Sequence, residues 1–261
     1  MNGVQKTLYI PLYGKAYVSR KGILLQDKKA EEIWAAEGFP LKGKSRSKWL
    51  AYYMGIRSAV FDTWLQQQMT EMQDAAVIHI GCGMDSRVLR VGTMRHMWYD
   101  VDFPEVIAER KRYYAESAEY HMLAGDARDG EWLQRIPETQ SAVVVMEGVS
   151  MYLSPRALQG VMENLCAHFD RLALLMDCYT VLAARMSKYR NPIRDVGVTA
   201  VYGMDDPGVL QNYGLVFVQE HVMIPQQYIE ELHGADKCIF RKLYAGKFAE
   251  RLYRLFEYRK T

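Results

Sequence analysis

The pattern of apolar and polar positions along the chain changes near residue 75. Before that point the chain reads as helical, and we expect a turn-rich start over residues 11–22, a helix over 27–37 and a longer helix over 47–72. In the longer helix apolar residues recur every three or four positions, which places them on one stripe that faces a core. The residues of this stripe are Trp49, Tyr53, Ile56, Val60 and Trp64.

After residue 75, short apolar runs alternate with amphipathic segments. Several of the runs are continuously apolar, which is typical of parallel strands that helices cover on both faces. We expect strands at residues 76–80, 97–101, 121–124, 142–146 and 172–176.

The amphipathic segments between these runs predict the crossover helices of a parallel sheet. We expect helices over 105–116 and 156–169, and Ser154 followed by Pro155 is a strong start signal for the second. Two later strand candidates, 215–222 and 251–258, carry charges, so we expect them towards an edge of the sheet.

These elements predict a doubly wound, Rossmann-like α/β fold with a helical N-terminal extension. We expect residues 1–74 to form the extension, which packs on the core as a lid, and residues 75–261 to form the ligand-binding domain. A chain of 261 residues is long enough to bury a sizeable core in one such unit.

Composition narrows the class of protein only slightly. With 33 Lys and Arg against 31 Asp and Glu, the net charge of +2 gives no basic surface of the kind that nucleic-acid binders show. No apolar run approaches the roughly 20 residues of a membrane helix, and the first residues do not resemble a signal peptide. We therefore expect no nucleic-acid or membrane partner.

The cysteines and histidines show no pattern of metal ligands. Cys82, Cys166, Cys178 and Cys238 lie far apart, and the six histidines have no metal-binding spacing. We therefore expect no metal site, and a reducing compartment, the cytoplasm, suits such cysteines.

The sharpest local signal is the segment IGCGMDS at the end of the first predicted strand. Its glycines, Gly81 and Gly83, allow a tight turn and let the backbone approach a ligand without a Cβ in the way. Ligands of open α/β sheets bind beyond the carboxyl ends of the strands, where this loop lies. A purely structural turn is the alternative.

The next strand ends at Asp102, about 20 residues after Gly81, the spacing at which a carboxylate grips ribose hydroxyls. Asp100 is a competing candidate for this role, although only Asp102 ends the strand. The structural alternative is that Asp102 caps the helix that starts at Pro104.

Further strands also end near acidic residues, Asp126 and Glu147, so one rim of the sheet is acidic. Such a rim would repel the pyrophosphate of a dinucleotide, and Ser86 replaces the third glycine of the dinucleotide fingerprint. A ligand with ribose, adenine and a positive centre but no phosphate fits better. S-adenosylmethionine (SAM) has these features.

SAM also carries a carboxylate, which needs a cation. Arg57 shares a helix face with Tyr53 and Phe61, so its guanidinium lies against apolar surface and needs an anionic partner. The alternative is a structural pair with Asp62 or another carboxylate. Lys15 is a second candidate cation, with a solvated lysine as its alternative.

Four ordered motifs, IGCGMDSRVLR, YDVDFPEVI, GDARD and EGVSMYL, resemble the leucine carboxyl methyltransferase family, in particular its bacterial polyketide-type O-methyltransferases. The resemblance covers roughly residues 10–180. It implies a class I SAM-dependent methyltransferase with a seven-stranded sheet whose last strand is antiparallel.

The resemblance also implies roles for single residues. Gly81 belongs to the SAM loop, Asp102 binds the ribose, and Asp126 and Ala127 flank the adenine. Glu147 lies near the amino-acid end of the cofactor. Arg57 and Lys15 match the residues that bind its carboxylate.

The short segment between Asp102 and His121 is similar to that of the family's small-molecule members. We therefore expect O-methylation of a carboxylate or hydroxyl on a small acceptor. Tyr152 is a candidate to shape the acceptor pocket, with a packed aromatic as the alternative, and residues 179–207 are expected to supply a lid.

Two other functions stay open at this point. The chain could be a nicotinamide-dependent oxidoreductase on a similar fold, or a regulatory protein that binds SAM without turnover. Responses to SAM and to nicotinamide dinucleotides would separate the first of these from a methyltransferase.

Overall fold

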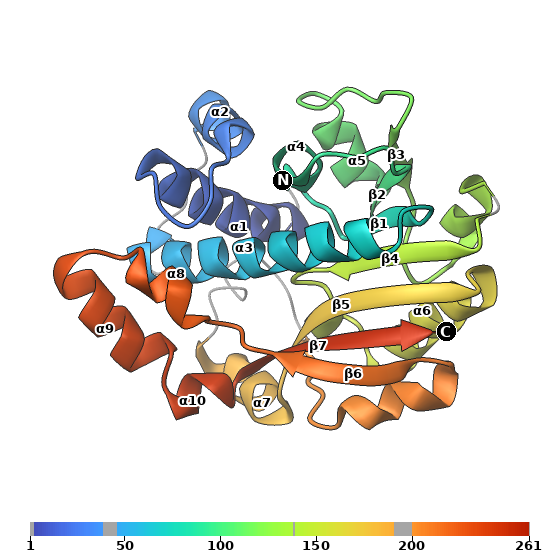
Figure 1. Ribbon diagram of the computed structural model, residues 1–261. Coiled ribbons are helices and arrows are strands. Elements are labelled where there is room, and N and C mark those ends of the chain that lie inside the picture. Colours follow the sequence, from blue (N-terminus) through green and yellow to red (C-terminus); the bar gives the residue numbers. More distant parts are fainter. Residues whose placement is uncertain (1–2, 39–45, 138, 191–199, 261) are drawn as a thin grey trace.

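The computed structural model in Figure 1 describes residues 3–38, 46–137, 139–190 and 200–260. These residues build a seven-stranded sheet with the order β3-β2-β1-β4-β5-β7-β6. The first five strands of the chain run parallel, and β7 is antiparallel to both β5 and β6. The strands are β1 (Ala76–Ile80), β2 (Trp98–Asp102), β3 (Tyr120–Ala124), β4 (Ser141–Met146), β5 (Arg171–Tyr179), β6 (Val216–His221) and β7 (Tyr253–Lys260).

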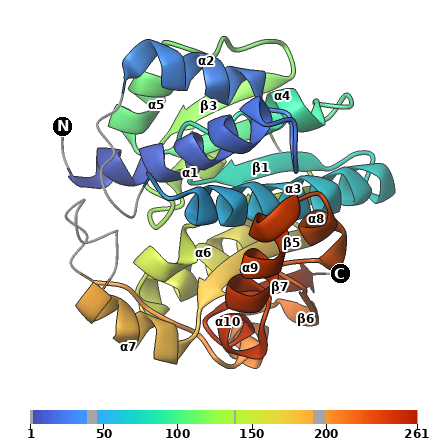
Figure 2. The ribbon, with the colours of Figure 1, turned by 90° about the vertical axis from the view of Figure 1, so that its left-hand side faces the viewer.

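Helices cover both faces of the sheet, as the continuous apolar strands predict. Figure 1 shows α3 crossing one face, and α1 lies beside it in both views (Figures 1 and 2). The helices are α1 (Gly3–Arg20), α2 (Lys28–Glu37), α3 (Lys48–Glu71), α4 (Arg87–Val91), α5 (Pro104–Arg110), α6 (Pro155–His168), α7 (Val181–Arg190), α8 (Gln226–Glu230), α9 (Gly234–Tyr244) and α10 (Lys247–Glu250). Short 3-10 turns are η2 (Glu131–Arg135), η3 (Ser150–Tyr152) and η5 (Pro207–Tyr213).

Alternate residues of the strands pack into two separate hydrophobic cores, one on each face of the sheet. On β4, for example, Val143 and Val145 pack towards α1–α3, while Val144 and Met146 pack towards α6. All four side chains are fully buried, which explains why this strand is apolar at every position. The predicted doubly wound α/β fold and its antiparallel last strand are therefore confirmed.

The predicted turn-rich start over residues 11–22 is wrong, because residues up to Arg20 belong to α1 and Pro11 lies inside that helix. Pro11 removes one backbone donor, but the helix is held by burial of Leu12 and Ala16 against α3. Gly14 permits a close approach and does not form a turn: a Cβ at this position would lie 2.7 Å from the Cβ of Met54.

Two other expectations need correction. The strand at 215–222 does lie at an edge, as β6, but the strand at 251–258 is β7, which lies between β5 and β6 and has a mostly buried side-chain pattern. The helix predicted over 105–116 ends already at Arg110 and is followed by turns.

Within the described residues, no helix is both long and apolar enough to cross a membrane.

Candidate functional site

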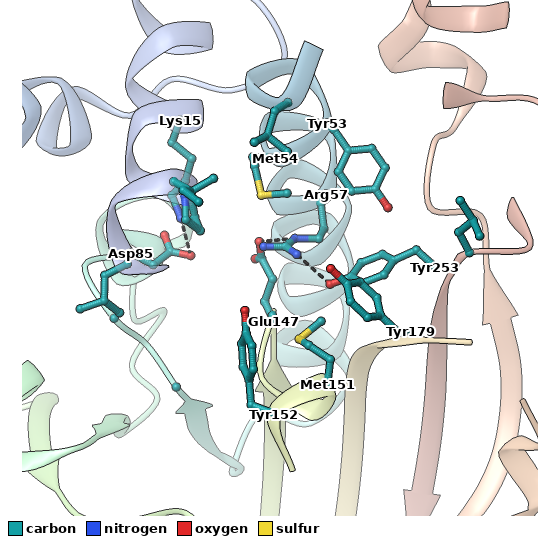
Figure 3. A pocket seen from close by; sticks show the side chains of 18 of the residues that line it. Lys15, Tyr53, Met54, Arg57, Asp85, Glu147, Met151, Tyr152, Tyr179 and Tyr253 are labelled. Carbon is teal, nitrogen blue, oxygen red and sulfur yellow. Dashed lines mark hydrogen bonds and ion pairs between the residues drawn. The ribbon is translucent and has the colours of Figure 1, made fainter. Parts of the chain in front are cut away.

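A cavity of about 660 Å³ opens at the carboxyl ends of β1 and β4. Its walls come from α1, α3, α7, α9 and α10, and from the ends of β5 and β7 (Figure 3). Six of the predicted site residues line this cavity, although they come from distant parts of the chain: Lys15, Arg57, Gly81, Gly83, Glu147 and Tyr152.

The glycine loop has the backbone that only glycine adopts easily. Gly81 has φ of +68° and Gly83 has φ of +50°. A Cβ at Gly81 would overlap the side chain of Val149, and one at Gly83 would lie 3.0 Å from Leu8. Any residue with a Cβ would therefore be strained and crowded at these two positions, so glycine is required for the loop to turn in this way beside the cavity.

Asp102 supports this loop from behind and does not line the cavity itself. Its Oδ2 accepts a hydrogen bond from the Gly83 N–H at 2.8 Å, and its Oδ1 accepts one from the Phe103 N–H at 2.8 Å. Burial raises the pKa of Asp102 to about 6, although these two hydrogen bonds lower it.

The competing carboxylate, Asp100, is bonded to side chains inside the protein and is not available to a ligand. It is fully buried, and it accepts hydrogen bonds from Arg110, from the Tyr120 hydroxyl at 2.7 Å and from the Trp98 indole at 2.9 Å. The arginine outweighs the effect of burial and holds the pKa of Asp100 at about 2. Asp100 is thus a structural residue, which leaves Asp102 as the acid at the strand end.

Asp126 and Ala127 follow the carboxyl end of β3, the end of the strands at which the cavity opens. They do not line the cavity. The carboxylate of Asp126 pairs with the exposed Arg128, and the hydrogen bonds from that residue lower its pKa. Ala127 packs against the core on the α6 side. The structure thus brings these two residues to the expected edge but not to the cavity wall.

Arg57 projects from α3 into the cavity and is almost completely buried (Figure 3). Its Nε donates to Glu147 Oε1 at 2.9 Å, and its Nη1 donates to the Tyr253 hydroxyl at 2.8 Å and lies 3.1 Å from Asp177 Oδ2. Among the described residues no hydrogen bond uses Nη2. The arginine therefore keeps one donor group for a ligand.

The alternative of a structural pair is confirmed for other carboxylates and not for Asp62, because Arg57 pairs with Glu147 and Asp177. The carboxylate of Asp62 instead accepts hydrogen bonds from Arg87 Nε and Arg90 Nε, both at 2.7 Å.

Glu147 lies at the centre of a cluster of buried charged side chains around Arg57, the ionic cluster. Besides Arg57, its partners are the Ser58 hydroxyl at 3.0 Å and the fully buried guanidinium of Arg87. Burial would raise the pKa of Glu147, but Arg57 and Arg87 outweigh it and hold the pKa at about 2. Glu147 is therefore a fixed negative charge at neutral pH.

Lys15 reaches the cavity from α1 and pairs with Asp85, with Nζ 3.1 Å from Oδ2. Because only 3% of Lys15 is exposed, the alternative of a solvated lysine is wrong. Asp85 also binds Arg90 Nη1 at 2.7 Å and lies 3.5 Å from Arg87 Nη2. These cations hold the pKa of Asp85 well below its usual value although burial raises it.

The sequence did not single out several members of this ionic cluster. Arg87, Asp85 and Asp177 are buried here, and Tyr253 lies on the last strand. The one signal available was the charge density of MDSRVLR, directly after the glycine loop.

Tyrosines dominate the wall opposite the glycine loop. Tyr53 packs at ring-centroid distances of 6.5 Å from Tyr244 and 6.0 Å from Tyr253, and Tyr179 lies 5.0 Å from Tyr253. Tyr152 also lines the cavity, partly buried against the core on the α3 side, so it is both packed and accessible to a ligand. In the described part of the chain, the hydroxyls of Tyr53, Tyr152 and Tyr244 have no hydrogen-bond partner.

The lid expected from residues 179–207 can be judged only in part. Tyr179, Ala183, Met186 and Ser187 line the cavity, while residues 191–199 lie outside the described residues. Within the described ranges no group of His, Cys, Asp and Glu side chains is arranged to hold a metal ion.

Comparison with known proteins gives the family. The sequence model named Leucine carboxyl methyltransferase matches residues 8–166, more than half of the chain. The chain belongs to this family. The family match makes this chain a SAM-dependent methyltransferase and decides against the nicotinamide-dependent oxidoreductase.

Individual relatives agree with this assignment. The chain is 27% identical over 261 residues to the tetracenomycin polyketide synthesis O-methyltransferase TcmP of Streptomyces glaucescens, covering 97% of each chain. It is 25% identical to the SAM-dependent methyltransferase dpfgK of Gibberella zeae, covering 82% of this chain and 79% of that one.

A solved structure shares the fold of this leucine carboxyl methyltransferase family member. The magnesium protoporphyrin IX methyltransferase of Synechocystis superposes with a TM-score of 0.54 at 11% identity, over 90% of this chain and 93% of that one. The strand order 3-2-1-4-5-7-6 is that of class I methyltransferases.

Proposed function

We propose that the chain transfers the methyl group of SAM to an oxygen of a small acceptor that is already an anion. The observation that carries this proposal is the state of the titratable groups lining the cavity. Glu147 and Asp85 are tied to cations, and the Nε2 of the buried His79 accepts a hydrogen bond from Arg87 at 3.1 Å. Burial lowers the pKa of His79 further.

Because their lone pairs are already bonded to cations, Glu147, Asp85 and His79 are poor general bases. An efficient base has a pKa near the working pH and a free lone pair aimed at the proton. Because the described cavity wall offers neither, an alcohol would have no partner to accept its proton. A carboxylate, or a phenol acidic enough to ionise in water, needs no such partner.

The proposal assigns SAM binding to residues at this end of the sheet. The glycine loop, with Gly81 and Gly83, turns beside the cofactor, and Asp102 at the end of β2 accepts hydrogen bonds from the ribose. The free Nη2 of Arg57 suits the cofactor's carboxylate, with Lys15 nearby as a second cation. Asp126 and Ala127 remain proposed neighbours of the adenine, on the same sheet edge.

When bound, SAM supplies an electrophilic methyl group on a positive sulfur. The chain's own contribution is to orient the two reactants and to exclude water, since an in-line transfer to an anion needs little covalent help. Glu147 adds a fixed negative charge near the amino-acid end of the cofactor.

The tyrosine wall supports an aromatic acceptor. Rings of Tyr53, Tyr179 and Tyr253 offer edges and faces to a planar ligand, and their packing geometry is the one that aromatic pairs prefer. The hydroxyls of Tyr53 and Tyr152 can donate to oxygens on its rim. A polyketide acceptor, as the name of the Streptomyces relative states for that protein, has this chemistry.

The test is methyl transfer from isotope-labelled SAM to matched acceptors at pH 7.5. We expect 2-naphthoic acid or 1-hydroxy-2-naphthoic acid to be methylated at least tenfold faster than 2-naphthalenemethanol, which has a similar ring but a neutral alcohol. Equal rates with the alcohol would contradict an anionic acceptor.

The same assay addresses the alternative of a SAM-binding regulatory protein without turnover. That protein would bind SAM in calorimetry and transfer no methyl group to any member of a wide acceptor panel. The four cysteines, all free thiols in the structure, support the cytoplasmic location that we propose.

A further inference from the structure

The glycine loop is held from below by side chains that never reach the cavity. Arg110, on α5, is fully buried, and its Nη1 donates to the Gly83 carbonyl oxygen at 2.9 Å. Its Nη2 pairs with Asp100 on β2, and its Nε donates to the Tyr120 hydroxyl at 3.1 Å. One guanidinium therefore ties the loop to two strands of the sheet.

Tyr114, in the turn after α5, adds a second tie. Its ring lies 4.0 Å from the Arg110 guanidinium carbon, so the cation stacks on an aromatic face. Its hydroxyl donates to the Met84 carbonyl oxygen at 3.0 Å. Like Arg110, Tyr114 is absent from the residues that line the cavity.

Side chains bond the backbone groups of Gly83 and Met84, which lie outside any helix or strand. The Gly83 N–H is bonded to Asp102, and the carbonyls of Gly83 and Met84 are bonded to Arg110 and Tyr114. Each of these partners is a side chain that fixes one backbone group. The positive φ of Gly83 is thus set by contacts on both sides of the peptide chain.

We propose that Arg110 and Tyr114 are positioning residues for SAM. They touch no ligand and act through the carbonyls of Gly83 and Met84, so that the loop is already in its binding shape when the cofactor arrives. A loop that must be ordered on binding loses part of the binding free energy to that ordering. Loosening the ties therefore weakens SAM affinity in addition to any loss of stability.

The decisive variant is Tyr114→Phe, which keeps the ring over Arg110 and removes only the bond to Met84. Its matched control is Tyr258→Phe on β7, which removes a hydroxyl hydrogen bond of 3.2 Å to the carbonyl of Pro207 in η5. Neither of these two residues lines the cavity. SAM affinity is measured by calorimetry, and stability by urea unfolding of the same samples.

We expect Tyr114→Phe to weaken SAM binding about fivefold, the size of one lost hydrogen bond, while Tyr258→Phe leaves it within twofold. Both variants should lose similar stability. Amide exchange over residues 81–85 should accelerate in ligand-free Tyr114→Phe only. Arg110→Lys, which keeps the charge for Asp100 but loses the fork, should weaken SAM binding at least as much.

Two results would overturn the proposal. One is unchanged SAM affinity in Tyr114→Phe, and the other is an equal loss of affinity in Tyr258→Phe, which would indicate a general effect of stability. The inference concerns SAM alone and not the acceptor. If the unaltered protein failed to bind SAM, the cofactor assignment would fail in that measurement, before any variant is compared.

Discussion

Arg57 Nε lies 2.9 Å from Glu147 Oε1, so the arginine predicted to bind the cofactor's carboxylate already faces a carboxylate of its own chain. The two residues are 90 positions apart in the sequence and meet where α3 passes over the end of β4. The pair lies in the wall of the cavity. A ligand carboxylate must therefore share this arginine with Glu147, through the Nη2 group that stays available.

We expect Arg57→Ala to weaken SAM binding at least tenfold in calorimetry. It leaves Glu147 and Asp177 without their common partner, and breaking a buried ion pair costs about 3–5 kcal/mol of unfolding free energy. Arg57→Lys should recover part of the stability but not the affinity, since an ammonium lacks the guanidinium fork. As a control, Arg241→Ala removes an exposed pair with Glu230 and should change neither by much.

SAM binding should depend on pH through Asp102, whose pKa of about 6 lies above its usual value because the group is buried. The carboxylate of Asp102, which we propose accepts the ribose hydroxyls, is ionised above pH 6 and becomes protonated as the pH falls through this value. We expect binding about tenfold weaker at pH 5 than at pH 7.5, from one protonation at pKa 6.

The variant Asp102→Ala identifies the group that titrates. It should bind SAM at least tenfold more weakly at pH 7.5 and should show a flat pH profile. Asp126, whose pKa is lowered by Arg128, stays ionised through this range. If Asp102→Ala kept the full pH dependence, another group would be responsible.

Gly81→Ala should abolish measurable SAM binding and destabilise the protein. Its positive φ strains any residue with a Cβ, and the new methyl group would overlap Val149. Gly92→Ala is a matched control, because Gly92 has φ of +79° but open space around the Cβ position. The comparison of urea midpoints separates the cost of backbone strain from the cost of the clash.

Lys15→Met should weaken SAM binding severalfold with a smaller loss of stability than Arg57→Ala. Its partner Asp85 keeps Arg90 and Arg87, so the carboxylate is not left without cations. Unchanged SAM affinity in Lys15→Met would remove Lys15 from the site. Calorimetry and urea unfolding on the same samples decide between these outcomes.

The sequence was most informative where burial dictates residue type. Val143 to Met146 must all be apolar because both faces of β4 are covered. This strand could therefore be predicted from its continuous apolar run. Asp102 could be found because strand end and glycine spacing are local features. Pro11 and Gly14 misled the prediction of α1, because tertiary packing against α3 outweighs their helix-breaking tendency.

The ionic cluster could not be predicted for a different reason. An arginine in a helix pattern gives no sign of which of 31 acidic residues will face it. Arg57 pairs with Glu147 and Asp177 and not with Asp62, which is near it in the sequence. The path of α3 over the sheet decides which carboxylates come within reach of the guanidinium. That path is a property of the whole fold and of no single motif.

The contact of Arg57 with Tyr253 has a consequence for how the protein is made. Tyr253 begins β7, so the chain up to this strand must leave the ribosome before this arginine acquires all the partners described here. Until then Arg57 can pair with Glu147 and Asp177, but its Nη1 lacks the hydroxyl of Tyr253 that helps to hold the guanidinium in place. A nascent chain arrested before residue 253 should therefore be a poor SAM binder even when the glycine loop and β1–β5 are already complete.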